Sequence, residues 1–238
     1  MYFLNGIDEQ ADKGFGILGD AFVEAADQLY KSKENSFLAH IHMPIGYLYR
    51  HAIELHLKSM IVIFHEQLEI PYGESSDKPQ ILLKDGRWRN IDDCHWLNAL
   101  YWYWSKLIND NREKLEEIAA EGSWLLNQKW EAMIDEIHSY DKDSSYFRYP
   151  FVKKDDKNRD AEKFLMQEVD GLENLEVKDG GVYMVYTDQP TTSGEINAVK
   201  IYSHKKGTLD DLIETAHILS NDLKGFHIMM RHTLCGGK

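Results

Sequence analysis

The segment from Pro44 to about Gln67 constrains the fold most, because polar and charged side chains interrupt an otherwise apolar helical pattern there. Its apolar and small residues recur at alternating spacings of three and four, in the order Ile45, Leu48, Ala52, Leu55, Ser59 and Val62. This spacing predicts a central helix with one stripe that faces a core or a partner. Beside that stripe, Glu54 stands four residues after Arg50 and four before Lys58, so both pairs can meet on the helix surface. The segment is therefore either an ion-pair ladder or part of a functional site.

The composition bounds the class of protein. With 238 residues, of which 43% are hydrophobic, the chain can bury a sizeable core. Its formal net charge of −13 opposes nonspecific attraction to nucleic acid, although a local basic cluster remains compatible with binding. Cys94 and Cys235 are too few for a disulfide framework. We find no secretion signal and no apolar run near the roughly 20 residues that span a bilayer, so we expect a soluble, cytoplasmic protein without membrane contact.

Apolar periodicity predicts four further helices. The first covers residues 17–31, follows the turn glycines Gly14, Gly16 and Gly19, and directs Leu18, Phe22, Ala25, Ala26 and Leu29 to the core. The next is capped by Asp92 or Asp93 and extends to about residue 108. Residues 124–140 contain another, and the last begins at Thr208 with acidic residues in its first turn.

An aromatic run interrupts this pattern in the helix that follows Asp93. Residues 101–104 read Tyr-Trp-Tyr-Trp and cover all sides of one helical turn. At least some of these rings must therefore meet another element or a partner chain, and we favour packing over ligand stacking.

β structure is expected in two places. A short hairpin around Asp85 and Gly86 fits the exposed connection at residues 71–90. Residues 181–186 and 198–202 are rich in β-branched and aromatic residues and predict an antiparallel pair. Between these places, Pro150 favours an extended conformation for residues 147–150.

We therefore expect a mostly α protein, a bundle of four to five helices with a small antiparallel β-hairpin insertion. Residues 1–150 form the core of the bundle, and residues 151–207 form a mixed-charge connector, centred on residues 153–163, and the hairpin insertion. Residues 208–238 return the chain to the bundle as a last helix.

Three segments in a fixed order carry a family resemblance. They are RHAIELHLK at residues 50–58, HWL at residues 95–97 and DSSYFRYP at residues 143–150. Over residues 15–150 the chain resembles the HEPN-like bacterial helical proteins. The resemblance implies an all-α bundle that often dimerises. It also implies either a metal-independent ribonuclease of toxin or phage-defence systems or a relative that binds nucleotides or has lost activity.

The nuclease signature of that superfamily is an arginine, a polar residue and a histidine a few positions later, and Arg50, His51 and His56 satisfy it. Metal-free RNA cleavage needs a base, an acid and a cation for the phosphorane. By the resemblance, His56 is the acid or base, Arg50 holds the phosphate and His51 orients the pair. Six residues turn about 240° on an ideal helix, so Arg50 and His56 of one chain cannot share a face. A homodimer with a composite cleft, arranged through the central helix region, would resolve this.

The noncatalytic alternative uses the same residues differently. Arg50, Glu54 and Lys58 then form a structural framework, and His56 is an ordinary helical histidine. His95 either binds substrate or hydrogen-bonds within the bundle. Arg148 adds a second cation near the cleft if its segment folds back over the central helix. Otherwise it pairs with Glu54 or caps a helix end.

No cofactor is expected from the sequence. His40, His42 and His65 lack the carboxylate or cysteine partners of a recognisable metal site, so no metal ligands are assigned. The partners we expect are RNA or a nucleotide, a second copy of the chain, and an antitoxin or defence partner. The leading function is a metal-independent endoribonuclease, and the alternative is a nonenzymatic helical module that binds nucleotide, RNA or a protein.

Overall fold

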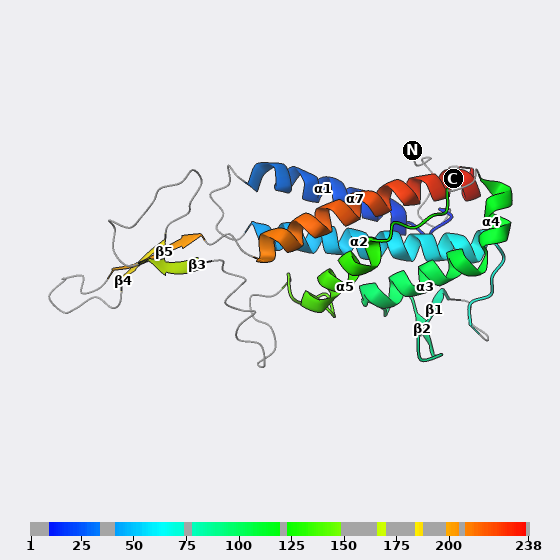
Figure 1. Cartoon of the computed structure of the whole chain (residues 1–238), viewed down its shortest axis with the longest axis horizontal. Helices are drawn as coiled ribbons and strands as arrows, with labels where there is room; N and C mark the ends of the chain where they lie inside the picture. The colour runs from blue at the N-terminus through cyan, green and yellow to red at the C-terminus, as the bar shows by residue number, and fades with distance from the viewer. Residues whose placement is uncertain are drawn as a thin grey trace.

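The computed structural model describes residues 10–33, 41–73, 78–119, 123–148, 166–169, 184–187, 199–204 and 208–236. Its helices are α1 (Phe15–Ser32), α2 (His42–Gln67), α3 (Leu97–Asp110), α4 (Arg112–Ile118), α5 (Trp130–Tyr140) and α7 (Thr208–Cys235). The three long helices α1, α2 and α7 lie side by side, and α3 and α5 pack on the other side of α2 and α7 (Figure 1). The expected mostly helical bundle is confirmed. None of the helices in the described ranges combines the length and apolarity that a membrane span requires.

Helix α2 occupies the centre of the bundle. It contacts α1, α3 and α7, and every residue from Ala52 to His65 is buried. The helix therefore has no solvent-exposed face over this length, although its sequence predicts a single buried stripe. The charged residues Arg50, Glu54 and Lys58 are buried as well, so their ladder lies inside the protein.

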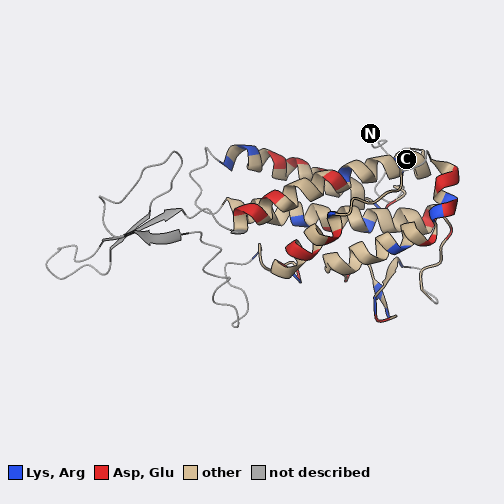
Figure 2. Ribbon diagram, viewed as in Figure 1, with Lys and Arg blue, Asp and Glu red and all other residues tan. Residues whose placement is uncertain are grey.

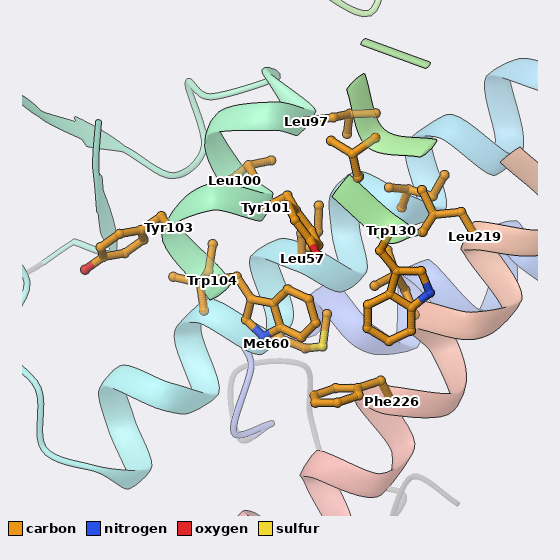
Figure 3. Packing of buried hydrophobic residues seen from close by; sticks show 14 of the residues in the cluster. Leu57, Met60, Leu97, Leu100, Tyr101, Tyr103, Trp104, Trp130, Leu219 and Phe226 are labelled. Carbon is orange, nitrogen blue, oxygen red and sulfur yellow. The ribbon is translucent and has the colours of Figure 1, made fainter. Parts of the chain in front are cut away.

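Aromatic rings form the core between α3, α5 and α7 (Figure 3). The ring centroid of Phe226 on α7 lies 5.2 Å from that of Trp104 and 5.8 Å from that of Trp130, both in edge-to-face orientation. Of the aromatic run on α3, Tyr101, Tyr103 and Trp104 are buried. The prediction that these rings pack is confirmed, and such pairs add about 0.5–1.5 kcal/mol each beyond the burial of their area.

Both expected antiparallel pairs are present. Strands β1 (Gln80–Leu82) and β2 (Trp88–Asn90) pair around a turn in which Gly86 has a φ of 84°. Strand β4 (Met184–Thr187) pairs with β5 (Val199–His204), as predicted. A further strand, β3 (Met166–Val169), pairs with the other edge of β5 and completes the order β3-β5-β4. Its sequence, MQEV, is too short and polar to have predicted a strand.

The buried face of α1 differs from the expected one. Its buried residues are Gly16, Gly19, Val23 and Ala26, whereas the side chain of Leu18 is 47% exposed. Gly16 and Gly19 lie within the helix and not in a turn before it. They are buried because α1 approaches α2 and α7 through its glycines, which present no side chain to the neighbouring helices.

The helix expected within residues 124–140 is present as α5, which begins at Trp130, and the unpredicted α4 precedes it. Trp124 lies before α5, and its indole N–H donates to the carbonyl of Leu115, 2.9 Å away. Two further local predictions are wrong. Asp92 and Asp93 do not cap α3, which begins after Trp96 with no side-chain cap. Phe147 and Arg148 lie in a turn and are not extended. Tyr149, Pro150, the connector at residues 153–163 and His40 lie outside the described residues.

Candidate functional site

Arg50 is the centre of a buried ion-pair network. Its guanidinium forms an ion pair with Glu54, donates to the backbone carbonyl of His95 and has Nε 3.2 Å from Oδ2 of Asp141. Lys58 Nζ lies 2.9 Å from the other carboxylate oxygen of Glu54. The expected pairs of the central helix therefore form, but the guanidinium is directed to internal partners at the start of α3 and the end of α5.

Glu54 is ionised despite its burial. Burial by itself would raise the pKa of its carboxyl, but Lys58 and Arg50 outweigh this effect and lower the pKa to about 2. His95, whose side chain is 44% exposed, also has Nδ1 2.9 Å from Glu54. Asp141 differs, because burial raises the pKa of its carboxyl against the opposing effect of Arg50. His95 thus connects the network to the surface, as the structural alternative for this residue predicts.

His56 belongs to a separate cluster. Its Nε2 lies 3.0 Å from Oδ1 of Asp20 on α1, and its ring centroid is 5.2 Å from that of His227 on α7. The side chain is completely buried, and burial is the main cause that lowers the pKa of the imidazole. Arg50 and His56 therefore contact different elements from different sides of α2. Within one chain, the structure does not bring the two residues of the nuclease signature together.

A serine, a histidine and an aspartate meet beside His56, but not as a catalytic triad. The hydroxyl of Ser59 donates to Asp12 over 2.7 Å and lies 2.7 Å from Nε2 of His227. Asp12 also approaches that same nitrogen, at 3.5 Å, whereas a triad needs the carboxylate on the other ring nitrogen. All three side chains are completely buried. The cluster cannot present a nucleophile to a substrate.

Asp12 connects the start of α1 to α7 through hydrogen bonds and an ion pair. Its carboxylate accepts from the backbone N–H groups of Gly14 and Gly16, at 3.0 and 2.9 Å, and from Arg231 at 3.1 Å. Burial would raise the pKa of Asp12, but hydrogen bonds from His227 and Ser59 and the charge of Arg231 lower it far below its ordinary value. These contacts give Asp12 a structural role.

Tyr47, His51 and Arg148 form an accessible cluster, which we call the Tyr47 surface. The rings of Tyr47 and His51 are stacked with centroids 5.6 Å apart, and the guanidinium carbon of Arg148 lies 5.3 Å from the Tyr47 ring centroid. Arg148 is exposed and donates to Ser144 Oγ over 3.1 Å. Burial is the main cause that lowers the pKa of His51, and the nearby cations Arg50 and Arg148 lower it further. At neutral pH the imidazole is therefore uncharged.

The Tyr47 surface exists because the segment after α5 folds back over α2. A Cβ on Gly46 would lie 2.4 Å from the ring of Phe147, so this glycine lets the segment approach the helix closely. Arg148 thus lies beside the first turns of α2, where it contacts the Tyr47 ring and Ser144. The carboxylate of Glu54 is held by Arg50, Lys58 and His95.

A shallow hollow of about 230 Å³ lies beside the β1–β2 hairpin, lined in part by Lys84, Arg87 and Trp96. Figure 2 shows basic positions on this hairpin, whereas acidic residues are spread over α1, α5 and α7. Arg87 pairs with Asp85 at 2.6 Å, and Arg89 lies over the Trp96 ring at 4.4 Å. Lys84 lies over the Trp102 ring at 6.0 Å.

The seven residues singled out from the sequence thus occupy three places. Arg50, Glu54, Lys58 and His95 share the buried network, His51 and Arg148 share the Tyr47 surface, and His56 lies apart from both. Sequence reasoning missed the polar partners Asp12, Asp20, Ser59, Asp141 and His227. No spacing signal could have found them, because each meets its partners through helix packing and not along one helix.

The fold and its polar centre define the class of this protein as a mostly helical bundle with buried ion pairs and two small antiparallel sheets. No family model matches the chain, and comparisons with curated proteins and with solved structures return no match.

Proposed function

We propose that this protein is a nonenzymatic, HEPN-like helical module that binds the phosphate of a nucleotide or of an RNA at the Tyr47 surface. The observation that carries the proposal is the contrast between two arginines. Arg50, the expected phosphate ligand, is completely buried among internal partners, whereas Arg148 is exposed.

Catalysis by Arg50 and His56 would require both residues to leave their partners. Removing Arg50 from its network would leave Asp141 without the guanidinium and Glu54 with Lys58 and His95 alone, and breaking a buried pair costs about 3–5 kcal/mol in such sites. His56 is completely buried against Asp20 and His227 and cannot reach a 2′-hydroxyl. These contacts favour the noncatalytic alternative for both residues.

The Tyr47 surface offers the groups that a phosphate ligand needs. A guanidinium carries five N–H donors in a fork that matches phosphate oxygens, and the contact of Arg148 with Ser144 occupies only one nitrogen. The uncharged His51 can add a hydrogen bond without a full charge. Because the net charge of the chain is −13, we expect a binding affinity that depends on this local cation and decreases with salt.

A metal-independent ribonuclease is the second candidate, and one observation favours it. His51 and Arg148 place an imidazole and a cation together at the surface, which are two of the groups required for cleavage. The third group would come from His51 of a second copy. A dimer of this kind would use the first turns of α2, since the helix is buried from Ala52 onward.

The two candidates are separated by measuring RNA binding and RNA cleavage in excess chelator. For the binding module, Arg148→Gln should weaken the affinity for a short labelled RNA by about tenfold or more, the loss of one charge-assisted hydrogen bond. Lys142→Gln, an exposed control with the same change in net charge, should bind as the wild type does. Cleavage by the wild type that is lost in His51→Ala would instead establish the ribonuclease.

A further inference from the structure

We infer that Asp20, His56 and His227 form a binding site for one divalent transition-metal ion, with Zn²⁺ as the ion that fits best. The three residues come from α1, α2 and α7. One potential ligand atom of each lies within 4.8 Å of the others. This site is distinct from the Tyr47 surface and does not depend on the proposed function.

The ligand set suits such an ion. Two imidazoles and one carboxylate bind zinc in sites that keep a fourth position open, and they also bind other first-row divalent metals. Bonds of about 2.1 Å in tetrahedral geometry put ligand atoms about 3.4 Å apart. His56 Nε2 and Asp20 Oδ1 are already 3.0 Å apart. The remaining pairs would need to close by at most about 1.4 Å, which small side-chain rotations can supply.

The second ring nitrogen of His227 supports this assignment. Nε2 is held by Ser59 at 2.7 Å, and Ser59 in turn donates to the carboxylate of Asp12. Nδ1 is buried and has no hydrogen-bond partner among the residues that the structure describes. A histidine that binds a metal through one ring nitrogen usually hydrogen-bonds through the other, either to a carboxylate directly or through an intervening group. His227 matches this pattern.

Nδ1 of His56 is likewise buried without a hydrogen-bond partner in the described part of the chain. Two such nitrogens in adjacent rings are unusual, because buried polar atoms are normally satisfied. Coordination of one ion through Nε2 of His56 and Nδ1 of His227 would give the second of these nitrogens a partner and leave Nε2 of His227 to Ser59. Nδ1 of His56 would then carry the ring proton and stay without a partner in the described part of the chain.

The backbone of α1 is shaped around the two imidazoles. A Cβ on Gly19 would lie 2.9 Å from the His56 ring, and a Cβ on Gly16 would lie 2.4 Å from the His227 ring. Any larger residue at either position would displace a proposed ligand. The glycines therefore permit the close approach of α1 that brings Asp20 to His56.

The charge states of the ligands are those that a metal requires. Burial lowers the pKa of His56, so its imidazole is neutral at pH 7. Burial would raise the pKa of Asp20, but the hydrogen bond with His56 and nearby charges lower it, so its carboxylate is ionised. Asp20 is 21% exposed, so solvent reaches this one of the three proposed ligands. Lys224 opposes the binding of a metal ion, because its positive charge also acts on Asp20 and His56.

The test is a Zn²⁺ titration of the full chain by calorimetry after removal of metals, with Co²⁺ absorption spectra as a second readout. We expect one ion per chain and the intense visible bands of tetrahedral Co²⁺. Asp20→Asn and His56→Gln should weaken binding by more than the roughly 10- to 100-fold that loss of an outer-shell partner causes. Lys224→Met should tighten it.

His65→Gln is the matched control. His65 is also a buried histidine of α2, but it is held by Tyr103 and the carbonyl of Ile70, both at 2.9 Å, and lies outside the proposed site. This variant should retain stoichiometric Zn²⁺ binding and an increase of Tm with Zn²⁺. If His56→Gln fails to fold, Asp20→Asn decides, since Asp20 is partly exposed. Absence of a stoichiometric site in the wild type, or equal binding by Asp20→Asn, would overturn the inference.

Discussion

Arg50 and Glu54 form their ion pair inside the helical bundle, where neither side chain is more than 1% exposed. On an exposed helix such a pair would contribute a few tenths of a kcal/mol. In the interior each member helps to compensate the buried charge of the other, together with Lys58 beside Glu54 and Asp141 beside Arg50. This pair, with Lys58 and Asp141, links α2 to the end of α5.

We expect Arg50→Ala to lower the free energy of unfolding by about 3–5 kcal/mol, because it leaves Glu54 and Asp141 buried without the guanidinium. Urea denaturation followed by circular dichroism measures this change. Arg112→Ala is the control, since Arg112 faces Glu116 at 3.8 Å on the surface, and it should cost at most about 1 kcal/mol. Equal losses in the two variants would contradict the buried role of Arg50.

The stability should decrease in acid through Glu54. The pKa of this carboxyl is about 2 in the folded protein and 4.5 ordinarily, so its contribution is complete above pH 4.5 and is lost as the pH falls toward 2. A shift of this size corresponds to about 3 kcal/mol. Asp141 acts in the opposite direction, because its pKa is raised.

Unfolding measured between pH 5 and pH 2 tests this dependence. Glu54→Gln should be less stable than the wild type at pH 7 and should show a smaller acid-dependent decrease, and the remainder should come from Asp12 and Asp20, whose pKa values are also lowered. If the free energy of unfolding of Glu54→Gln falls with pH in parallel with that of the wild type over this range, the decrease comes from other carboxyls.

Buried neutral histidines should add a second pH dependence nearer neutrality. Burial lowers the pKa of His56 below the ordinary value of 6.5, so the unfolded chain binds a proton more readily than the folded one. Stability is therefore complete above pH 6.5 and decreases as the pH falls below it. His51 and His65 act in the same direction.

In excess chelator, His56→Gln should show a smaller decrease in Tm between pH 7 and pH 5 than the wild type. His232→Gln, at an exposed position of α7, should retain the wild-type profile. If both variants give the wild-type slope, His56 is not the titrating group.

Gly19 and Gly225 offer a matched pair of glycine-to-alanine changes. Gly19→Ala places a methyl group 2.9 Å from the His56 ring and should destabilise the protein by about 1–3 kcal/mol, the usual cost of overpacking. Gly225→Ala in α7 meets no atom within 4 Å and should stabilise by about 0.5–1 kcal/mol, because alanine restricts the unfolded chain. Thermal unfolding of both variants measures the difference, and a neutral Gly19→Ala would show that α1 can move away from His56.

Long periodic helices were predictable from the sequence. The apolar residues that recur at helical spacing in α7 and α3 are buried: Leu209, Leu212, Ile213, Ala216, Leu219, Leu223 and Phe226 in α7, and Leu97, Leu100, Tyr101, Trp104, Leu107 and Ile108 in α3. Their patterns depend only on the helical repeat and on one continuous apolar face. The buried face of α1 was not predictable, because the close approach of its glycines to two histidine rings decides it.

The candidate sites were predictable only in part. The pairs of Glu54 with Arg50 and Lys58 follow from a spacing of four residues, which places side chains together on any helix. The separation of Arg50 from His56 also follows from helix geometry. The approach of Arg148 to Tyr47 depends on the turn around Ser144, whose φ of 63° the sequence pattern does not predict.

The sequence by itself determined where the long helices α1, α2, α3 and α7 form, where the β1–β2 and β4–β5 pairs form and which neighbours along α2 meet, because these features depend on local spacing. Only the tertiary structure decided that the charges of α2 are buried, that Arg148 and not Arg50 is accessible, and that Asp20, His56 and His227 come together. The physical reason is that burial and long-range contacts depend on how the helices pack. The local sequence around a residue does not show which distant residues it will contact.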